Sequence, residues 1–272
     1  MVTSVPSLSD SVRAEVKGRL DRFESRHDVR VLYACESGSR AWGFASPDSD
    51  YDVRVVYVHP RDWYLSIDLE RRDDAIDPEI EDASVGEIDI HAWDLRKALR
   101  LFRKSNPSLI EWLQSPLVYR EDAAVMTRWR DLLLEYYRPK AAGYHYLSMA
   151  RTNVDRYLRD ADTVPLKKYL YVLRPLLAIR WIGADRGPVP VEFARLVDAC
   201  VEDEDLRHAI DDLLEEKRAA GEMASAAPIP ELQDFAFSEL ERLQNTDFAG
   251  RSSRAGIEPL NRLFRDVLDG SG

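Results

Sequence analysis

The sequence predicts an α+β protein in which a small mixed sheet with helices is followed by an all-helical domain. Two observations carry this prediction. In the first part of the chain short β-rich runs alternate with turn residues, and from about residue 94 the apolar spacing changes from two to the 3.6 residues of a helix. We expect the first domain to span residues 1–122 and the second to span residues 123–272.

The elements of the first domain follow from local patterns. Serine and aspartate near the start can cap an amphipathic helix. The run at 51–58 alternates at its start and is then apolar throughout, as a strand does when it enters a core covered on both sides. We expect a helix at 8–26, a strand at 29–36, a short helix or tight loop at 39–45, a strand at 51–58, a short helix at 63–67 and a strand at 87–93.

From residue 94 onward the spacing predicts helices. Leu95, Leu99 and Phe102 fall on one face of a helix, and Pro107 stands near the first position of a short helix capped by Asn106. Further helices are expected as one or two over 122–160, one over 165–182, and at least three more before the C-terminus.

Composition narrows the class of protein. Of the 272 residues 45% are hydrophobic and 32% charged, which is ordinary for a soluble globular protein. We see neither a secretory signal nor an apolar run near the roughly 20 residues that cross a bilayer. Cys35 and Cys200 lack CxxC partners, which favours reduced thiols and a cytoplasmic location. The net charge of −11 disfavours broad coating of nucleic acid and suits a protein that gathers carboxylates around divalent metal.

The most informative stretch is GSRAWGFASPDSDYDVR, at 38–54. It begins with Gly38 and Ser39, a turn able to cradle phosphates, and reaches Asp50 and Asp52 at the start of an apolar strand. Residues two apart in a strand point the same way, so both carboxylates share one face. Such a pair repels unless a cation lies between, and Mg²⁺ is the usual one. A lone D-x-D is more often a solvated strand edge, but the upstream turn favours a metal site.

A third carboxylate is expected on the strand at 87–93. Its isoleucines face the core, so Glu87, Asp89 and His91 face outward. Asp89 is the natural third ligand because it is central on that face. Glu87 is the second choice, and a structural role is favoured for His91.

With these residues the chain resembles the DNA polymerase β-type nucleotidyltransferase superfamily. The resemblance is carried by Gly38-Ser39, by Gly43, by the D-x-D pair and by an acid on a later strand. The phrase ESGSRAWGFASPDSDYDVR, with SNPSLIEWL and KKYLYVLRPLLAIRW, is similar to a bacterial and phage group of predicted nucleotidyltransferases, some of them associated with RNA ligases and RNA repair. The resemblance spans about residues 32–182 and implies a polymerase β-like catalytic core over the first domain.

The resemblance also implies a metal site. Asp50 and Asp52 would bridge two Mg²⁺ or Mn²⁺ ions and the nucleotide phosphates. Asp89 would bind the catalytic metal and help to activate the attacking hydroxyl. Such an ion pair stabilises both the entering and the leaving oxygen of an in-line displacement.

Nucleotide-binding residues follow from the same resemblance. Ser39 and the backbone amides after Gly38 would hold the phosphates of ATP or another NTP, at the start of the following short helix. Arg40 is a further candidate phosphate ligand. Gly43 either allows a close backbone approach or is a simple turn glycine.

A second set of candidates lies on the long helix that starts near residue 165. Beside its apolar stripe, Lys167, Tyr171 and Arg174 fall on one adjacent face. Two cations and an aromatic ring suit a clamp on a triphosphate with a stacked base or sugar. A solvated flank of an amphipathic helix is an equally favoured interpretation, and Lys168 or Tyr169 would substitute if the helix phase differs.

The predicted function is that of a metal-dependent nucleotidyltransferase, which moves an NMP from an NTP to a hydroxyl and releases pyrophosphate. An RNA end is the first choice of acceptor because of the group that the chain resembles. A protein side chain is the second choice, and a small-molecule hydroxyl is a further alternative. A non-catalytic regulatory module is the alternative from a different class. Its mark would be loss of a carboxylate or of the glycine-serine turn, all of which this chain keeps.

Overall fold

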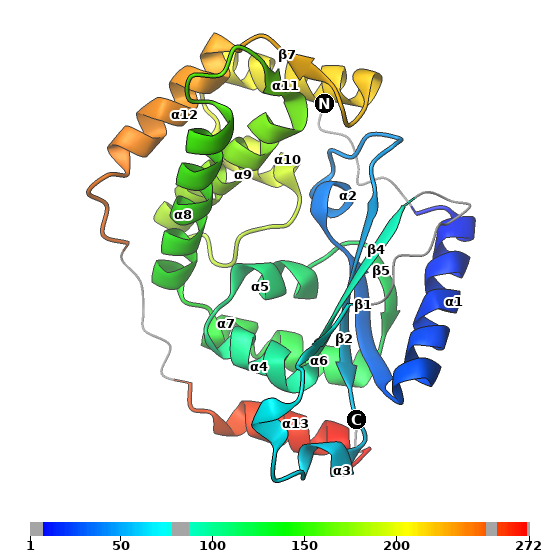
Figure 1. The fold of residues 1–272 in the computed structure, drawn as a ribbon. Helices are drawn as coiled ribbons and strands as arrows, with labels where there is room; N and C mark the ends of the chain where they lie inside the picture. Colours follow the sequence, from blue (N-terminus) through cyan, green and yellow to red (C-terminus); the bar gives the residue numbers. More distant parts are fainter. Residues whose placement is uncertain (1–7, 78–86, 249–254, 271–272) are drawn as a thin grey trace. The chain divides into compact units, whose positions relative to one another are not determined.

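The computed structural model describes residues 8–77, 87–248 and 255–270 (Figure 1). These residues form a five-stranded mixed sheet with helices and a further series of helices, so the predicted α+β class is confirmed. The helices within these ranges all lack the length and apolar character of a membrane span.

The chain divides into two compact units. Of the described residues, we call 8–41, 50–77, 87–137 and 255–270 the sheet unit, and we call 42–49 and 138–248 the helical unit. This division differs from the expected domains 1–122 and 123–272 because a loop of the first half groups with the helices and the C-terminal helix groups with the sheet.

The sheet has the strand order β3-β4-β2-β1-β5. The strands are β1 (Arg30–Glu36), β2 (Tyr51–Val58), β3 (Ala75–Ile76), β4 (Ile88–Asp94) and β5 (Val118–Glu121). β2 and β4 run parallel, and the other neighbours are antiparallel. The three strands expected from the sequence are present. β3 and β5 escaped the sequence pattern because they are short and largely half-exposed, without an apolar run.

The two faces of β2 are covered differently along its length. Val53 and Val55 are fully buried, and Tyr57 on the same side contacts Phe23 of α1. On the other side Val56 joins the core cluster, whereas the residues nearer the start of the strand are polar. The strand therefore runs from a polar end into a two-sided core, as its sequence predicts.

Helices of the sheet unit begin at polar caps. Ser9 accepts the N–H of Val12 at the start of α1, Asp94 caps α4, and Asn106 caps α5. The helices are α1 (Asp10–His27), α2 (Gly38–Trp42), α3 (Arg61–Tyr64), the 3₁₀ turn η1 (Leu69–Arg71), α4 (Leu95–Arg103), α5 (Pro107–Leu113), α6 (Ala123–Asp131), α7 (Leu133–Tyr136) and α13 (Glu258–Leu268). α3 starts before the expected 63–67 because Pro60 precedes its first turn.

The helical unit contains four-turn and longer helices together with shorter ones. They are α8 (Pro139–Tyr157), α9 (Leu166–Gly183), α10 (Phe193–Cys200), α11 (Glu204–Ala220) and α12 (Pro230–Arg242), with a small hairpin of β6 (Val164–Pro165) and β7 (Ser225–Ala226). The expected one or two helices over 122–160 are wrong, since this segment holds α6, α7 and α8. Pro139 starts a new helix because its ring cannot continue the preceding one.

Candidate active site

The glycine-serine turn lies directly against Asp52. Gly38 has φ of +59°, in the left-handed region that glycine adopts at low cost. A Cβ at this position would lie 2.0 Å from Oδ2 of Asp52. The Ser37 amide also donates to the Asp52 carbonyl oxygen at 2.9 Å. Glycine is therefore required at position 38 by its backbone conformation and by the close approach of a predicted metal ligand.

The surroundings of Gly43 are different. Its φ is +89°, but an added Cβ would meet no atom within 4 Å. The open space beside Gly43 is compatible with both interpretations, a turn glycine and a close backbone approach to a nucleotide, and both stay predictions.

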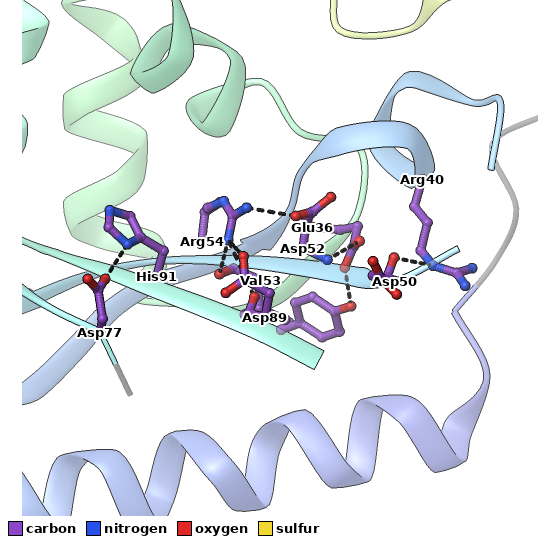
Figure 2. A network of polar contacts seen from close by, with 10 residues as sticks. Glu36, Arg40, Asp50, Asp52, Val53, Arg54, Asp77, Asp89 and His91 are labelled. Atoms are coloured by element: carbon purple, nitrogen blue, oxygen red, sulfur yellow. Dashed lines mark hydrogen bonds and ion pairs between the residues drawn. The ribbon is translucent and has the colours of Figure 1, made fainter. Parts of the chain in front are cut away.

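Asp52 and Asp89 are neighbours across the parallel strands β2 and β4. The register pairs Asp52 with Asp89 and Arg54 with His91. The Arg54 guanidinium lies between the two carboxylates, with Nη2 at 2.7 Å from Asp52 Oδ1 and Nη1 at 2.9 Å from Asp89 Oδ2 (Figure 2). Glu87 immediately precedes β4, and its carbonyl oxygen accepts the Tyr51 amide. Asp89, and not Glu87, thus occupies the position opposite Asp52.

Asp50 stands just outside this pair. It is exposed and comes immediately before β2. Its carbonyl oxygen accepts Nε of Arg40 at 3.1 Å (Figure 2). The Arg40 guanidinium lies 3.8 Å from the centre of the Tyr51 ring. Arg40 is therefore close to both Asp50 and the turn, where it was predicted.

Glu36 is a residue of this network that the sequence reasoning missed. It is the last residue of β1 and is fully buried. Its carboxylate accepts the Asp52 amide at 2.9 Å and the Tyr119 hydroxyl. Burial raises the pKa of Glu36 to about 7, although both hydrogen bonds oppose the rise. A charged residue that closes the apolar run VLYAC just before the turn was the available signal.

Burial and neighbouring charges act together on the pKa of Asp52. Burial raises the pKa of Asp52, and the charges of Asp89 and Asp50 raise it further, while the Arg54 guanidinium lowers it. Two acids so close together need a positive charge, and in the folded chain Arg54 supplies it.

His91 has both ring nitrogens engaged. Nδ1 pairs with the Asp77 carboxylate (Figure 2). Nε2 accepts the Trp93 indole N–H at 2.8 Å. This arrangement fits the structural role expected for His91.

The donor set fits a hard divalent cation in its chemistry. Carboxylate oxygens are the ligands that Mg²⁺ and Mn²⁺ take, and the position between Asp52 and Asp89 already accommodates a cationic group. In the part of the chain that the structure describes, no three His, Cys, Asp or Glu residues are gathered as a metal cluster. The folded chain thus brings together two carboxylates and an arginine, with Asp50 beside them.

The candidates on α9 lie in the helical unit. Lys167 pairs with Glu222 at 3.4 Å, and Lys168 lies 4.6 Å from the Tyr171 ring centre. Lys168 rather than Lys167 is thus the lysine that stacks on Tyr171. Arg174 is 2% exposed, and its guanidinium lies 4.6 Å from the centre of the Trp42 ring. Arg174 is therefore buried, which does not fit the interpretation of this face as a solvated flank.

The segment between the turn and Asp50 is fixed by the end of α11. The buried Lys217 ammonium donates to Ser46 Oγ at 2.8 Å and pairs with Glu222 at 2.9 Å. Ser49 Oγ donates to the same Glu222 carboxylate. The Glu222 amide donates to the Asp48 carboxylate at 3.0 Å. Residues near 220, in a tail without any motif, thus position the residues that precede Asp50.

The chain is similar to known proteins. A model of the RNA repair pathway DNA polymerase beta family matches residues 12–266. Uncharacterized protein YcgL of Bacillus subtilis (strain 168) is 41% identical over 259 residues, which cover 95% of this chain and 97% of YcgL. The crystal structure of a nucleotidyltransferase-like protein from Exiguobacterium sibiricum 255-15 aligns at 9% identity with a TM-score of 0.34, over 95% of this chain and 80% of that chain.

Proposed function

Because the chain belongs to the RNA repair pathway DNA polymerase beta family, we propose that it is a metal-dependent nucleotidyltransferase that moves an NMP from an NTP to the hydroxyl of an RNA end. In this reaction the acceptor oxygen forms a bond to the α-phosphorus. The bond from that phosphorus to the oxygen bridging to the β-phosphate breaks, and pyrophosphate leaves. The hydroxyl proton passes to a base.

One observation supports this proposal above the others. Asp52 and Asp89 lie opposite each other on parallel strands, and the backbone of the glycine-serine turn lies in contact with Asp52. A phosphate-binding turn and an acidic pair in contact are what transfer of a nucleotidyl group from a triphosphate requires.

The proposed metal ligands are Asp50, Asp52 and Asp89. When bound, two Mg²⁺ or Mn²⁺ ions would supply positive charge for the entering and leaving oxygens. Glu36 would orient Asp52 through its amide, and burial of Glu36 below the strand end would keep this contact dry.

The proposed nucleotide ligands come from two elements. Gly38, Ser39 and Arg40 would bind the phosphates at the turn, where Arg40 lies beside the Asp50 carbonyl. On α9 we retain Tyr171, with Lys168 stacked on it, as a surface for the base or sugar. Lys167 and Arg174 are kept as weaker candidates, because one pairs with Glu222 and the other is buried on Trp42.

The test is transfer of label from each α-³²P-labelled NTP in the presence of Mg²⁺ or Mn²⁺. Each reaction is run with total RNA, with a protein extract, and without an acceptor. Label in RNA that disappears in Asp52→Asn and Asp89→Asn supports the proposal. Label in protein or in a small molecule would replace the RNA end by that acceptor.

A matched control separates chemistry from folding. Asp62→Asn changes an exposed acid of α3 in the same unit and should retain full transfer. If no acceptor takes label and no NTP binds, the nucleotidyltransferase proposal fails. Equal transfer by the wild type and Asp52→Asn would remove Asp52 from the site.

A further inference from the structure

Arg54 makes ion pairs with two of the three predicted metal ligands. Its Nη2 and Nη1 atoms lie 2.7 Å from Asp52 and 2.9 Å from Asp89. Weaker contacts of Nη1 go to the carbonyl oxygens of Val53 at 3.3 Å and Asp89 at 3.4 Å. Figure 2 shows the guanidinium between the two strands, directed toward both carboxylates.

This contact is more than a surface ion pair. The Arg54 and Asp52 side chains, two residues apart on β2, are 17% and 31% exposed, and Asp89, which lies opposite Asp52 on β4, is 47% exposed. Exposed pairs contribute little because water screens them and both side chains lose freedom. Here the strands fix the carboxylates, and one planar guanidinium serves both, which is the geometry at which arginine excels.

Arg54 holds one oxygen of each carboxylate, Oδ1 of Asp52 and Oδ2 of Asp89. A divalent ion that bound both carboxylates would lie close to the guanidinium, and the two positive charges would repel each other. We therefore infer that Arg54 is an internal counter-cation, which holds the Asp52–Asp89 pair together and weakens the binding of a divalent ion to both carboxylates. The inference rests on the proposed function in one respect, since it takes Asp52 and Asp89 to be metal ligands.

The role has a functional consequence. Without Arg54 the metal-free site would hold two carboxylates with no positive charge between them. With Arg54 the negative charge of the pair is largely neutralised, and a metal ion would have to share both carboxylates with a positive charge. Arg54 would thus make the empty protein more stable and its affinity for free metal ions lower.

The direct test is Mn²⁺ binding in the absence of nucleotide, measured by titration calorimetry and by the electron paramagnetic resonance signal of free Mn²⁺. Arg54→Gln removes the positive charge and keeps a polar side chain of similar length. It should bind Mn²⁺ about tenfold more tightly than the wild type, because the competing cation is gone. Arg54→Lys, which keeps the charge but loses the two-pronged contact, should fall between them.

Thermal unfolding supplies an independent measurement and a check on folding. Without metal, Arg54→Gln should melt below the wild type because its carboxylates repel, and Mn²⁺ should raise its melting temperature by more than that of the wild type. Arg61→Gln is the matched control, since Arg61 forms an exposed pair with Asp269 in the same unit. It should change neither the Mn²⁺ affinity nor the stabilisation by Mn²⁺.

The outcomes separate the inference from the proposed function. If Asp52→Asn and Asp89→Asn weaken Mn²⁺ binding but neither Arg54→Gln nor Arg54→Lys strengthens it, the acidic pair remains a metal site and the role of Arg54 is overturned. If Mn²⁺ binding is unchanged in both Asp variants, or absent from all proteins, the metal site fails and the Arg54 inference fails with it. Tighter binding by Arg54→Gln that is lost in Arg54→Gln/Asp89→Asn supports both.

Discussion

Asp52 is held from several directions at the scale of single residues. Its amide donates to Glu36, its carbonyl oxygen accepts from Ser37, and its carboxylate meets both Arg54 and the Cα of Gly38. A carboxylate fixed in this way loses little further freedom when it acquires a ligand. The arrangement of backbone around Asp52 is therefore as much a part of the candidate site as the acids themselves.

Gly38→Ala tests this arrangement. The left-handed backbone costs a non-glycine residue about 1–2 kcal/mol, and the new Cβ would lie 2.0 Å from Asp52 Oδ2, so the carboxylate must move. We expect transfer activity to fall about 100-fold, the loss that follows from misplacing a reacting group by about 1 Å. The measurement is kcat for NMP transfer together with a urea unfolding curve.

Gly43→Ala is the control for backbone strain. Its φ of +89° carries a similar conformational cost, but nothing lies within 4 Å of the added Cβ. It should lose stability and keep most of its activity. Equal losses of activity in both variants would mean that the contact with Asp52 does not matter.

The same residues indicate what a sequence can predict. Asp50, Asp52 and Asp89 are recognisable because strand periodicity alone puts them on one face. The ion pair of Arg54 with Asp89 depends on the register of β2 against β4, and the contact of Glu36 with Asp52 depends on the register of β1 against β2. Strand pairing cannot be predicted from a short segment of sequence, so these contacts of Arg54 and Glu36 are known only from the folded structure.

At the scale of elements, the end of α11 and the segment 46–49 form one polar network. The buried Lys217 pairs with Glu222, which also accepts from Ser49. Burial raises the pKa of Glu222, but the Lys217 and Ser49 hydrogen bonds and the charge of Lys167 outweigh it, so the pKa is lowered overall. This network therefore fixes the segment 46–49 within the helical unit.

Glu222→Gln should therefore be less stable than the wild type at pH 7, by about 1–3 kcal/mol, because a buried ammonium loses its charged partner. An acid with a lowered pKa in the folded state contributes stability above its unfolded pKa and loses it as pH falls through the folded pKa. The difference between variant and wild type should thus shrink below about pH 4.5, the ordinary value for Glu. Urea unfolding from pH 7 to pH 3 measures this.

Glu216→Gln provides the comparison, because Glu216 is an exposed acid on the same helix. It should match the wild type at every pH. A Glu222→Gln protein whose stability loss does not depend on pH would show that the pair with Lys217 does not carry the effect.

Elements themselves were predicted unevenly, for physical reasons. β2 and α9 are long apolar runs whose local pattern and burial agree. The residues VYRE of β5 are largely half-exposed and include two charged side chains, so their own pattern does not predict a strand. They form one because they pair with β1. The division of 122–160 into three helices depends on where tertiary packing turns the chain, of which Pro139 is the one local sign.

At the scale of the whole molecule, the chain does not complete the sheet unit within its first half. α13 brings Leu260, Leu263 and Val267 into the same buried cluster as Leu32 of β1 and Trp129 of α6. The last helix, more than a hundred residues beyond the rest of the unit, is therefore part of its core. Local periodicity predicts helices but not which unit they pack in, so it could not predict that α13 belongs with the sheet.

Leu263→Ala tests whether this C-terminal helix is structural for the sheet. Removing a buried leucine side chain costs about 2–5 kcal/mol, because the apolar contacts are lost and a cavity remains. If the sheet unit includes α13, amide hydrogen exchange should accelerate in β1 and β2 more than in α9.

Ile257→Ala, at a position 47% exposed just before α13, should change neither region. Faster exchange in α9 with an unchanged sheet would instead favour the division at residue 122, in which α13 belongs with the other helices. Faster exchange in the sheet alone would mean that the sheet, which carries the candidate metal ligands Asp52 and Asp89, depends on α13 for its stability.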